Sequence, residues 1–297
     1  MAISGGSETR KFLVALTFLL PSLVALLVFV FGPMLASLWF SLNRWNILSP
    51  MEYVGLSNFQ RLFSDRLWWA SLVNTVVYSV LNIPLVIAVS ILFALIVNKK
   101  AARGRTLFKV VYFMPVVVSE VAISVVWRWV LSTNYGILNA ALNAVGLPAF
   151  GWLTTSRLAL LSVVGVVVWR WAGYYMVIMM AALNEVPNEL YETASIDGVG
   201  TIRQFIYITL PFMKPVMFFV AVMCTLGSFQ MFDIIYMMTQ GGPGSSTYLT
   251  GFYLYQTAFT HLRMGYGSSM AAVLFVILLG ITVFQMKFSK SSLSGVY

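Results

Sequence analysis

The sequence predicts an all-α integral membrane protein with six transmembrane helices. Of its 297 residues, 60% are hydrophobic and only 9% are charged, whereas soluble domains carry about 25% charged residues. The mean hydropathy is +0.88, and the apolar residues form long continuous runs without a period-two alternation. Such runs favour helices over the strands of a membrane barrel, because a helix satisfies its backbone hydrogen bonds within one segment.

Six apolar runs are long enough to cross a hydrocarbon layer of about 30 Å. The first follows Arg10 and Lys11 and is longer than a signal-peptide core, so we expect it to be a retained span. Pro115, inside the third run, is expected to mark a kink or a span end. The six runs predict one transmembrane domain over residues 1–297, with spans at residues 12–31, 72–97, 110–130, 158–183, 215–238 and 268–286.

The basic residues predict the orientation of these spans. With six spans both termini lie on one side, and eleven of the 18 Lys and Arg residues fall on that side against five on the other. The positive-inside rule therefore predicts cytoplasmic N and C termini. The same bias accounts for the net charge of +9 without nucleic-acid binding. The run from Lys99 to Lys109 is suited to anionic membrane lipid.

The sequence offers little for enzymatic chemistry. Cys224 is the single cysteine and His261 the single histidine, so neither a disulfide framework nor a zinc site is expected. No combination of nucleophile, base and oxyanion donors is apparent in the sequence. We therefore expect a protein that is not an enzyme and that binds no metal.

A polar segment at residues 184–211 interrupts the pattern between the fourth and fifth spans. The chain has nine acidic residues, and four of them lie within 13 positions here: Glu185, Glu189, Glu192 and Asp197. The predicted orientation places this segment in the cytoplasm. Two interpretations remain open from the residues alone: a docking surface for a partner protein, or an amphipathic helix that merely connects two spans.

The residues of this segment predict a short helix. Pro187 suits the first helical turn and Asn188 is able to cap it. Gly198 and Gly200 permit a left-handed turn that ends the helix after about ten residues. A second amphipathic piece, residues 202–210, is predicted to lead back into the membrane at Pro211.

The polar segment also carries a family signature. Glu192-Thr193-Ala194-Ser195-Ile196-Asp197-Gly198, followed by Leu210-Pro211, resembles the "EAA" motif in the membrane subunits of binding-protein-dependent ABC importers. Thr193 stands where the motif usually has alanine. The resemblance implies that this helix couples the membrane subunit to an ATPase, and it assigns the coupling role to Glu192, Ala194, Asp197 and Gly198.

Further motifs resemble one branch of that family. Tyr112-Phe113-Met114-Pro115, Gly136-Ile137-Leu138-Asn139 and Met238-Thr239-Gln240-Gly241-Gly242-Pro243 are similar to segments of sugar permeases. The pattern resembles the first of the two permeases in maltose-type and glycerol-phosphate-type systems. The chain lacks the extra N-terminal spans and the large outer insertion of the maltose member. The Gly241-Gly242-Pro243 loop is expected to receive the binding protein, to break the helix, or both.

The resemblance implies a type I ABC importer permease fold in the bacterial cytoplasmic membrane, also called the inner membrane. It implies four kinds of partner: a second homologous permease, two ATPase subunits, an extracytoplasmic solute-binding protein and a sugar or sugar derivative. The sequence has no G-x-x-x-x-G-K-[ST] phosphate loop, so ATP and Mg²⁺ are expected in the ATPase chain. The alternative of an ion-coupled secondary transporter stays open at this point.

Intramembrane polar residues suggest the substrate path. The resemblance places six residues along it: Arg170, Trp171, Tyr174, Gly227, Ser228 and Met231. The intramembrane charges Glu120 and Asp233 are the other two of eight candidates. Arg170 has two open interpretations, because it is able to pair with an anionic group of the substrate or with Glu120 or Asp233 in a buried network. Asn74 and Asn82 are interpreted as residues that make hydrogen bonds between helices.

Overall fold

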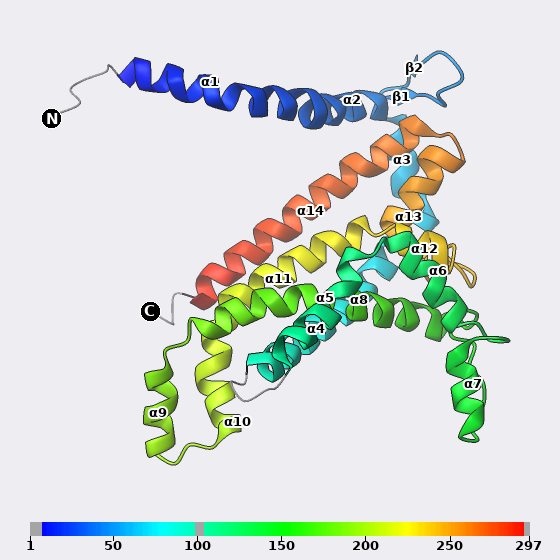
Figure 1. Ribbon diagram of the computed structural model, residues 1–297. Helices are drawn as coiled ribbons and strands as arrows, with labels where there is room; N and C mark the ends of the chain where they lie inside the picture. Colours follow the sequence, from blue (N-terminus) through cyan, green and yellow to red (C-terminus); the bar gives the residue numbers. More distant parts are fainter. Residues whose placement is uncertain (1–7, 99–103, 294–297) are drawn as a thin grey trace. The chain divides into compact units, whose positions relative to one another are not determined.

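A computed structural model describes residues 8–98 and 104–293 (Figure 1). Lys99, Lys100 and Arg103 of the predicted lipid-binding run lie outside the described residues. The described chain is helical apart from its loops and one antiparallel pair of short strands, in which β1 (Asn43–Arg44) pairs with β2 (Glu52–Tyr53). It divides into two compact units, which share helix α14 (Met264–Leu293).

The first unit comprises the described part of residues 1–64 and Gln256–Phe275. Asn58 donates hydrogen bonds to the carbonyls of Ser41 and Asn43, at 2.9 and 3.0 Å. These bonds connect helix α3 (Ser57–Ser64) to the end of helix α2 (Gly32–Ser41). Besides β1, β2 and the start of α14, the unit contains α1 (Glu8–Leu26), the π-helix η1 (Leu27–Phe31), α2 (Gly32–Ser41), α3 (Ser57–Ser64) and the π-helix η3 (Gln256–Thr260).

The second unit comprises Asp65–Tyr255 and the described part of residues 276–297. Figure 1 places α9 and α10 at one end of this unit and α6, α7 and α12 at the other. Its elements are α4 (Arg66–Asn98), α5 (Arg105–Val117), α6 (Glu120–Val130), α7 (Ile137–Ala144), α8 (Ser156–Asn184), α9 (Asn188–Ile196), α10 (Thr201–Gln204), the π-helix η2 (Phe205–Thr209), α11 (Leu210–Gln230), α12 (Asp233–Met238), α13 (Thr250–Tyr255) and the rest of α14.

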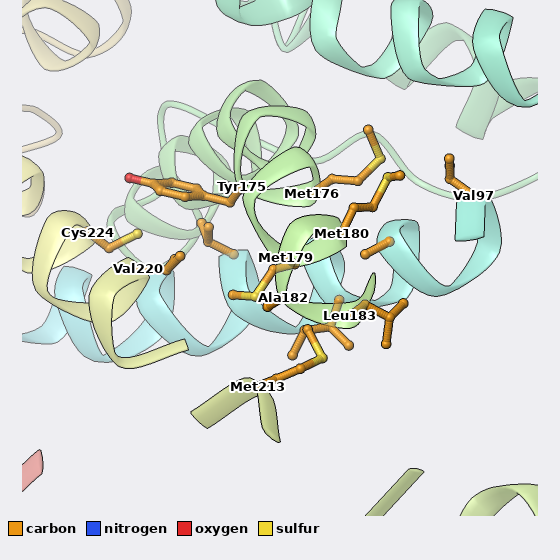
Figure 2. Packing of buried hydrophobic residues seen from close by; sticks show 13 residues of the cluster. Val97, Tyr175, Met176, Met179, Met180, Ala182, Leu183, Met213, Val220 and Cys224 are labelled. Carbon is orange, nitrogen blue, oxygen red and sulfur yellow. The ribbon is translucent and has the colours of Figure 1, made fainter. Parts of the chain in front are cut away.

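The core of the second unit lies between α4, α8 and α11. Met176 and Met179 of α8 and Met213 of α11 are fully buried there, and Figure 2 shows their side chains gathered with Tyr175 and Cys224. Methionine suits such a junction because its unbranched, flexible side chain fills irregular gaps between helices. This core holds α4, α8 and α11 together, and the shorter helices of the unit are attached to these three.

The predicted spans largely correspond to observed helices. Within residues 8–98 and 104–293, five helices are long and apolar enough to cross a membrane, and a sixth span is formed if α5 and α6 are counted together. The five are Lys11–Ser41, Arg66–Asn98, Ser156–Asn184, Thr201–Gln230 and Met264–Lys287.

Two predicted spans differ from the structure, because each is interrupted. The sequence predicts one span over residues 110–130, but the structure has two helices there, α5 and α6. The chain bends by 100° between them, at Val118 and Ser119. Both residues have extended backbone, with ψ values of 142° and 136°, and Pro115 in the preceding turn removes one helical hydrogen bond. The predicted span over residues 215–238 ends early in the same way, because α11 stops at Gln230 and α12 starts as a separate helix.

Close packing of α8 on α5 generates the first prediction. A Cβ atom at Gly173 would collide with the backbone carbonyl of Tyr112, so Gly173→Ala is expected to push the two helices apart. Overpacking of this kind lowers the free energy of unfolding by about 1–3 kcal/mol, and we expect the Tm of the purified protein to fall by roughly 3–10 °C.

Gly165→Ala on the same helix is the matched control. A Cβ atom at Gly165 meets no heavy atom of the described residues within 4 Å, and alanine is the better helix former. Its Tm is expected to stay the same or rise. Equal loss in both variants would show that the α5–α8 contact is not the cause.

Candidate functional site

A cavity of about 460 Å³ lies in the second unit, between α4, α6, α8, α11 and α12. Its wall combines aromatic side chains with a few polar groups, which is the usual composition of a small-molecule site. The polar and aromatic lining residues are Tyr78, Asn82, Glu120, Trp171, Tyr174, Tyr175, Ser228, Gln230, Phe232 and Asp233.

Both helix interruptions open onto this cavity. Glu120 is the first residue of α6 and Asp233 is the first residue of α12, and both line the cavity. A carboxylate in the first turn of a helix is favoured by the partial positive charge of the helix N-terminus. The breaks therefore serve to present two acidic side chains at membrane depth, where irregular backbone is tolerated only against protein or a cavity.

Arg170 of α8 lies behind the cavity wall. Its side chain forms an ion pair with Glu120, donates a hydrogen bond to the carbonyl of Val118 at 3.4 Å, and lies over the ring of Trp171 at 5.1 Å. The residue is only 6% exposed and is not among the lining residues. Of the two interpretations of Arg170, the buried pair is the one formed in this structure.

The structure brings the other residues of the expected substrate path to one place. Trp171 and Tyr174 form an edge-to-face aromatic pair, with 5.7 Å between ring centroids. Ser228 is buried and donates to the carbonyl of Cys224 at 2.7 Å. The cavity lining contains seven of the eight expected residues: Glu120, Trp171, Tyr174, Gly227, Ser228, Met231 and Asp233.

Sequence reasoning missed the wall that α4 contributes. Asn82 is predicted to make a hydrogen bond between helices, but its Oδ1 has no hydrogen-bond partner among the described residues and the side chain lines the cavity. Tyr78, one turn earlier, also lines the cavity, and its hydroxyl also has no hydrogen-bond partner among the described residues. The available signal was two polar residues at i and i+4 in an apolar span, which share one helix face.

Asn74, on the same helix, makes hydrogen bonds, but not between helices as the sequence predicts. Its side-chain amide donates to the carbonyls of Ser245 and Tyr248, at 2.7 and 3.2 Å, so its partners belong to a loop and not to another helix. In that loop the Thr247 hydroxyl lies 2.8 Å from the Gly242 carbonyl, to which it donates, and 2.8 Å from the Thr239 hydroxyl. The loop that carries Gly241-Gly242-Pro243 is therefore ordered by its own contacts.

The second candidate site is the acidic helix α9. The prediction of a short helix agrees with the observed nine residues, Asn188–Ile196. Its details differ: Pro187 occupies the cap position with extended backbone, and Asn188 is the first helical residue and makes no side-chain cap. Gly198 has a φ of 74°, as a helix-ending glycine should, whereas Gly200 is extended with a φ of −68°.

Helix α9 is held against the segment that follows it. The Tyr191 and Thr209 hydroxyls are 2.8 Å apart, and Gln204 donates to Ser195 Oγ and to the Val199 carbonyl, at 3.1 and 2.9 Å. The predicted second amphipathic piece, residues 202–210, is not separate. It belongs to the continuous helix Thr201–Gln230, so α9 is tied directly to the base of that helix.

The outer face of α9 is exposed and of mixed character. Glu192 and Ile196 are at i and i+4, which places them on one face, and Ile196 is 86% exposed. Asp197 and Gly198 are also exposed, and Ala194 is half-buried. A face that combines acidic side chains with a solvent-exposed isoleucine is the kind of surface that a partner protein covers.

Comparison with known proteins identifies the family. The sequence profile of "Binding-protein-dependent transport system inner membrane component" matches residues 66–287, which include both candidate sites. The chain belongs to this family. It is therefore an inner membrane component of a binding-protein-dependent transport system, and a transport component rather than an enzyme.

Individual relatives agree over almost the whole chain. The probable ABC transporter permease protein YurN of Bacillus subtilis (strain 168) is 36% identical to this chain. The alignment covers 92% of this chain and 95% of YurN. The lactose transport system permease protein LacF of Rhizobium radiobacter is 34% identical, over 90% and 89%. A chain in the crystal structure of a bacterial alginate ABC transporter in complex with alginate pentasaccharide-bound periplasmic protein matches this chain with a TM-score of 0.85 at 22% identity. The match covers 96% of this chain and 97% of that chain.

These findings decide between the two transport mechanisms that the sequence left open. Membership of the family and the ABC permease relatives favour the ATP-driven importer over the ion-coupled secondary transporter. The likeness to the alginate transporter chain shows that this chain shares its fold, and the family match agrees with that fold. In the part of the chain that the structure describes, no group of three or more His, Cys, Asp or Glu residues is placed to hold a metal ion.

The ion pair between the buried Arg170 and the half-buried Glu120 generates the second prediction. Arg170→Met leaves Glu120 unpaired, and Glu120→Leu leaves Arg170 unpaired in the protein interior. Breaking a buried pair from one side costs roughly 3–5 kcal/mol, whereas replacing both partners by apolar residues is often nearly neutral. We expect each single variant to lose roughly 5–10 °C in Tm and the double variant to recover most of that loss.

Arg44→Met supplies the control, because Arg44 pairs with Glu52 at 3.0 Å but both side chains are more than half exposed. An exposed pair contributes about 0–1 kcal/mol, so little change in Tm is expected. A double variant of Arg170 and Glu120 whose loss equals the sum of the two single losses would contradict the pairing.

Proposed function

We propose that this chain is the transmembrane permease subunit of an ATP-driven importer that moves a sugar or sugar derivative from an outer binding protein into the cytoplasm. Family membership carries the transport role, and the lactose permease LacF supports the sugar class. The aromatic and hydrogen-bonding wall of the cavity adds independent support, because sugars are bound by ring faces together with polar groups. We also propose that the chain is a multi-pass protein of the bacterial cytoplasmic membrane.

The proposed assembly contains a second homologous permease, two ATPase subunits and an extracytoplasmic binding protein. ATP and Mg²⁺ belong to the ATPase chains, since this sequence has no phosphate-binding loop. The ordered loop around Gly242 is proposed to receive the binding protein. It lies next to α12 and α13, at the end of the second unit opposite α9 in Figure 1.

Helix α9 is proposed as the coupling helix. Its exposed face offers Glu192 as the charged contact to the ATPase, with Ala194 allowing close approach and Asp197 and Gly198 shaping the turn. The ties from Gln204 and Tyr191 make α9 part of the base of the membrane helix that ends at the cavity. Movement of the ATPase would therefore reach the cavity by rigid-body displacement of helices.

The substrate path is proposed to run through the cavity. Trp171 and Tyr174 of α8 supply ring surface, and Ser228 of α11 supplies a hydroxyl, with Gly227 and Met231 completing that wall. Glu120 and Asp233 contribute acceptors. Arg170 acts on this path through Glu120, which its charge holds in place.

The coupling role generates the third prediction. Glu192→Ala removes the proposed contact, and Gly198→Pro blocks the left-handed conformation at a φ of 74°, which proline is unable to adopt. We expect both variants to insert into the membrane at normal levels while uptake falls at least 10-fold. The ATPase should also no longer copurify with the tagged permease.

Thr193→Ala is the matched control on the same helix. Thr193 is exposed, and alanine is the usual residue of the motif at this place, so uptake and copurification should remain near those of the unchanged protein. Normal uptake in both Glu192→Ala and Gly198→Pro would count against a coupling helix.

The power source generates the fourth prediction. Liposomes that contain this chain alone should show no concentrative sugar uptake under a proton or sodium gradient. Liposomes with the full set of partners should accumulate sugar when ATP and Mg²⁺ are supplied. Gradient-driven uptake by the chain alone would overturn the proposed mechanism.

A further inference from the structure

Two polar side chains of α4 line the cavity without a protein partner. The Tyr78 hydroxyl and the Asn82 Oδ1 are buried atoms that make no hydrogen bond to the described residues. Tyr78 is 0% exposed and Asn82 is 4% exposed, and both line the cavity. Buried polar groups are nearly always paired in proteins, so two unpaired groups in one cavity wall need an explanation.

Helix geometry places these two groups together. Residues at i and i+4 lie one above the other on a helix face, so the hydroxyl and the amide form one short polar strip along α4. Several other polar residues of this helix are paired: Thr75 bonds to Thr250 at 2.9 Å, and Ser90 bonds to the Ala172 carbonyl at 3.2 Å. Trp68 Nε1, near the start of α4, is also buried without a partner among the described residues but does not line the cavity, so Tyr78 and Asn82 are the unpaired groups of α4 that border it.

The charges around the cavity limit what this strip is able to bind. Among the described lining residues none is Lys, Arg or His, and the charged ones are Glu120 and Asp233. The nearby cation, Arg170, is already paired with Glu120. The remaining carboxylate makes the cavity unfavourable for an anion, because like charges repel strongly where water is scarce.

We infer that Tyr78 and Asn82 are specificity-determining residues that contact an uncharged, hydroxyl-bearing sugar in this cavity. The inference rests on the proposed function and narrows its substrate class. A sugar hydroxyl is both donor and acceptor, so one hydroxyl donates to Asn82 Oδ1 and another accepts from the Tyr78 hydroxyl. A ligand that lacks these hydroxyls leaves the two buried groups unpaired, which is how such sites reject it.

The experiment uses cells that express this chain with the other genes of its transporter. Uptake of radiolabelled lactose and maltose is compared with uptake of glucuronate and glucose 6-phosphate. We expect a neutral sugar to be transported and the two anions to be excluded. Tyr78→Phe and Asn82→Leu should each raise the KM for that sugar about 3- to 10-fold, the effect of one lost hydrogen bond.

A second measurement separates binding from folding. Because neither group makes a hydrogen bond to the described residues, Tyr78→Phe and Asn82→Leu should leave the Tm of the purified, sugar-free transporter unchanged or raised. A purely structural residue would show the reverse, with a lower Tm and an unchanged KM. The matched controls are Tyr112→Phe on α5 and Ser79→Ala on α4, whose side chains are not among the lining residues and whose KM should stay within about twofold.

Three results would overturn the inference. They are an unchanged KM in both variants, a loss of Tm without a change in KM, and preferred uptake of glucuronate or glucose 6-phosphate. Absence of uptake for all four sugars in the unchanged protein would instead overturn the proposed function, which keeps the two failures distinguishable.

Discussion

The contact on which this structure depends is the ion pair between Arg170 and Glu120. A helix that breaks inside a membrane leaves carbonyl and amide groups without partners, and the hydrocarbon offers no water to replace them. At the break between α5 and α6, Arg170 meets that need from α8. Its guanidinium pairs with the Glu120 carboxylate and donates to the Val118 carbonyl.

That contact explains why an arginine tolerates burial at this depth. An isolated charge inside a membrane is costly, and the chain offsets the cost by placing the counter-charge on a neighbouring helix. The pair fixes the start of α6 against α8, and α12 packs against α6 and α8 in turn. The cavity thus lies between the two interrupted spans, α5–α6 and α11–α12, and the continuous helix α8, which keeps them in place.

The sequence predicted the fold well because hydrophobic runs and basic flanks report directly on membrane spans. It predicted the position of α9 because Pro187 and Gly198 act on the backbone locally. The 100° bend after Pro115 was beyond it, since proline permits a straight, kinked or broken helix and the choice depends on the partner that Arg170 supplies. Asn82 was misjudged for a similar reason, because no pattern in α4 reveals whether the facing helix brings a hydrogen-bond partner.

The cavity lining divides into two groups with different origins. Trp171 and Ser228 were expected from the family pattern, and they come from helices whose polar residues stand next to recognisable motifs. Tyr78 comes from a helix without such a motif, so only the three-dimensional packing shows that it borders the same space. Sequence motifs identify the lining residues that relatives share. The lining residues of α4 belong to no such motif, so they are where the lining of one family member is able to differ from that of another.

The helical segment from Thr201 to Gln230 has a mechanical consequence. Thirty helical residues span at most about 45 Å, so this segment connects the support of α9 to the wall formed by Gly227 and Ser228. It passes through the π-helical turn η2, and above that turn α11 is 21 residues, or about 32 Å, long. A tilt of α11 by about 10° around its midpoint would displace each of its ends by about 3 Å, in opposite directions and at the same time.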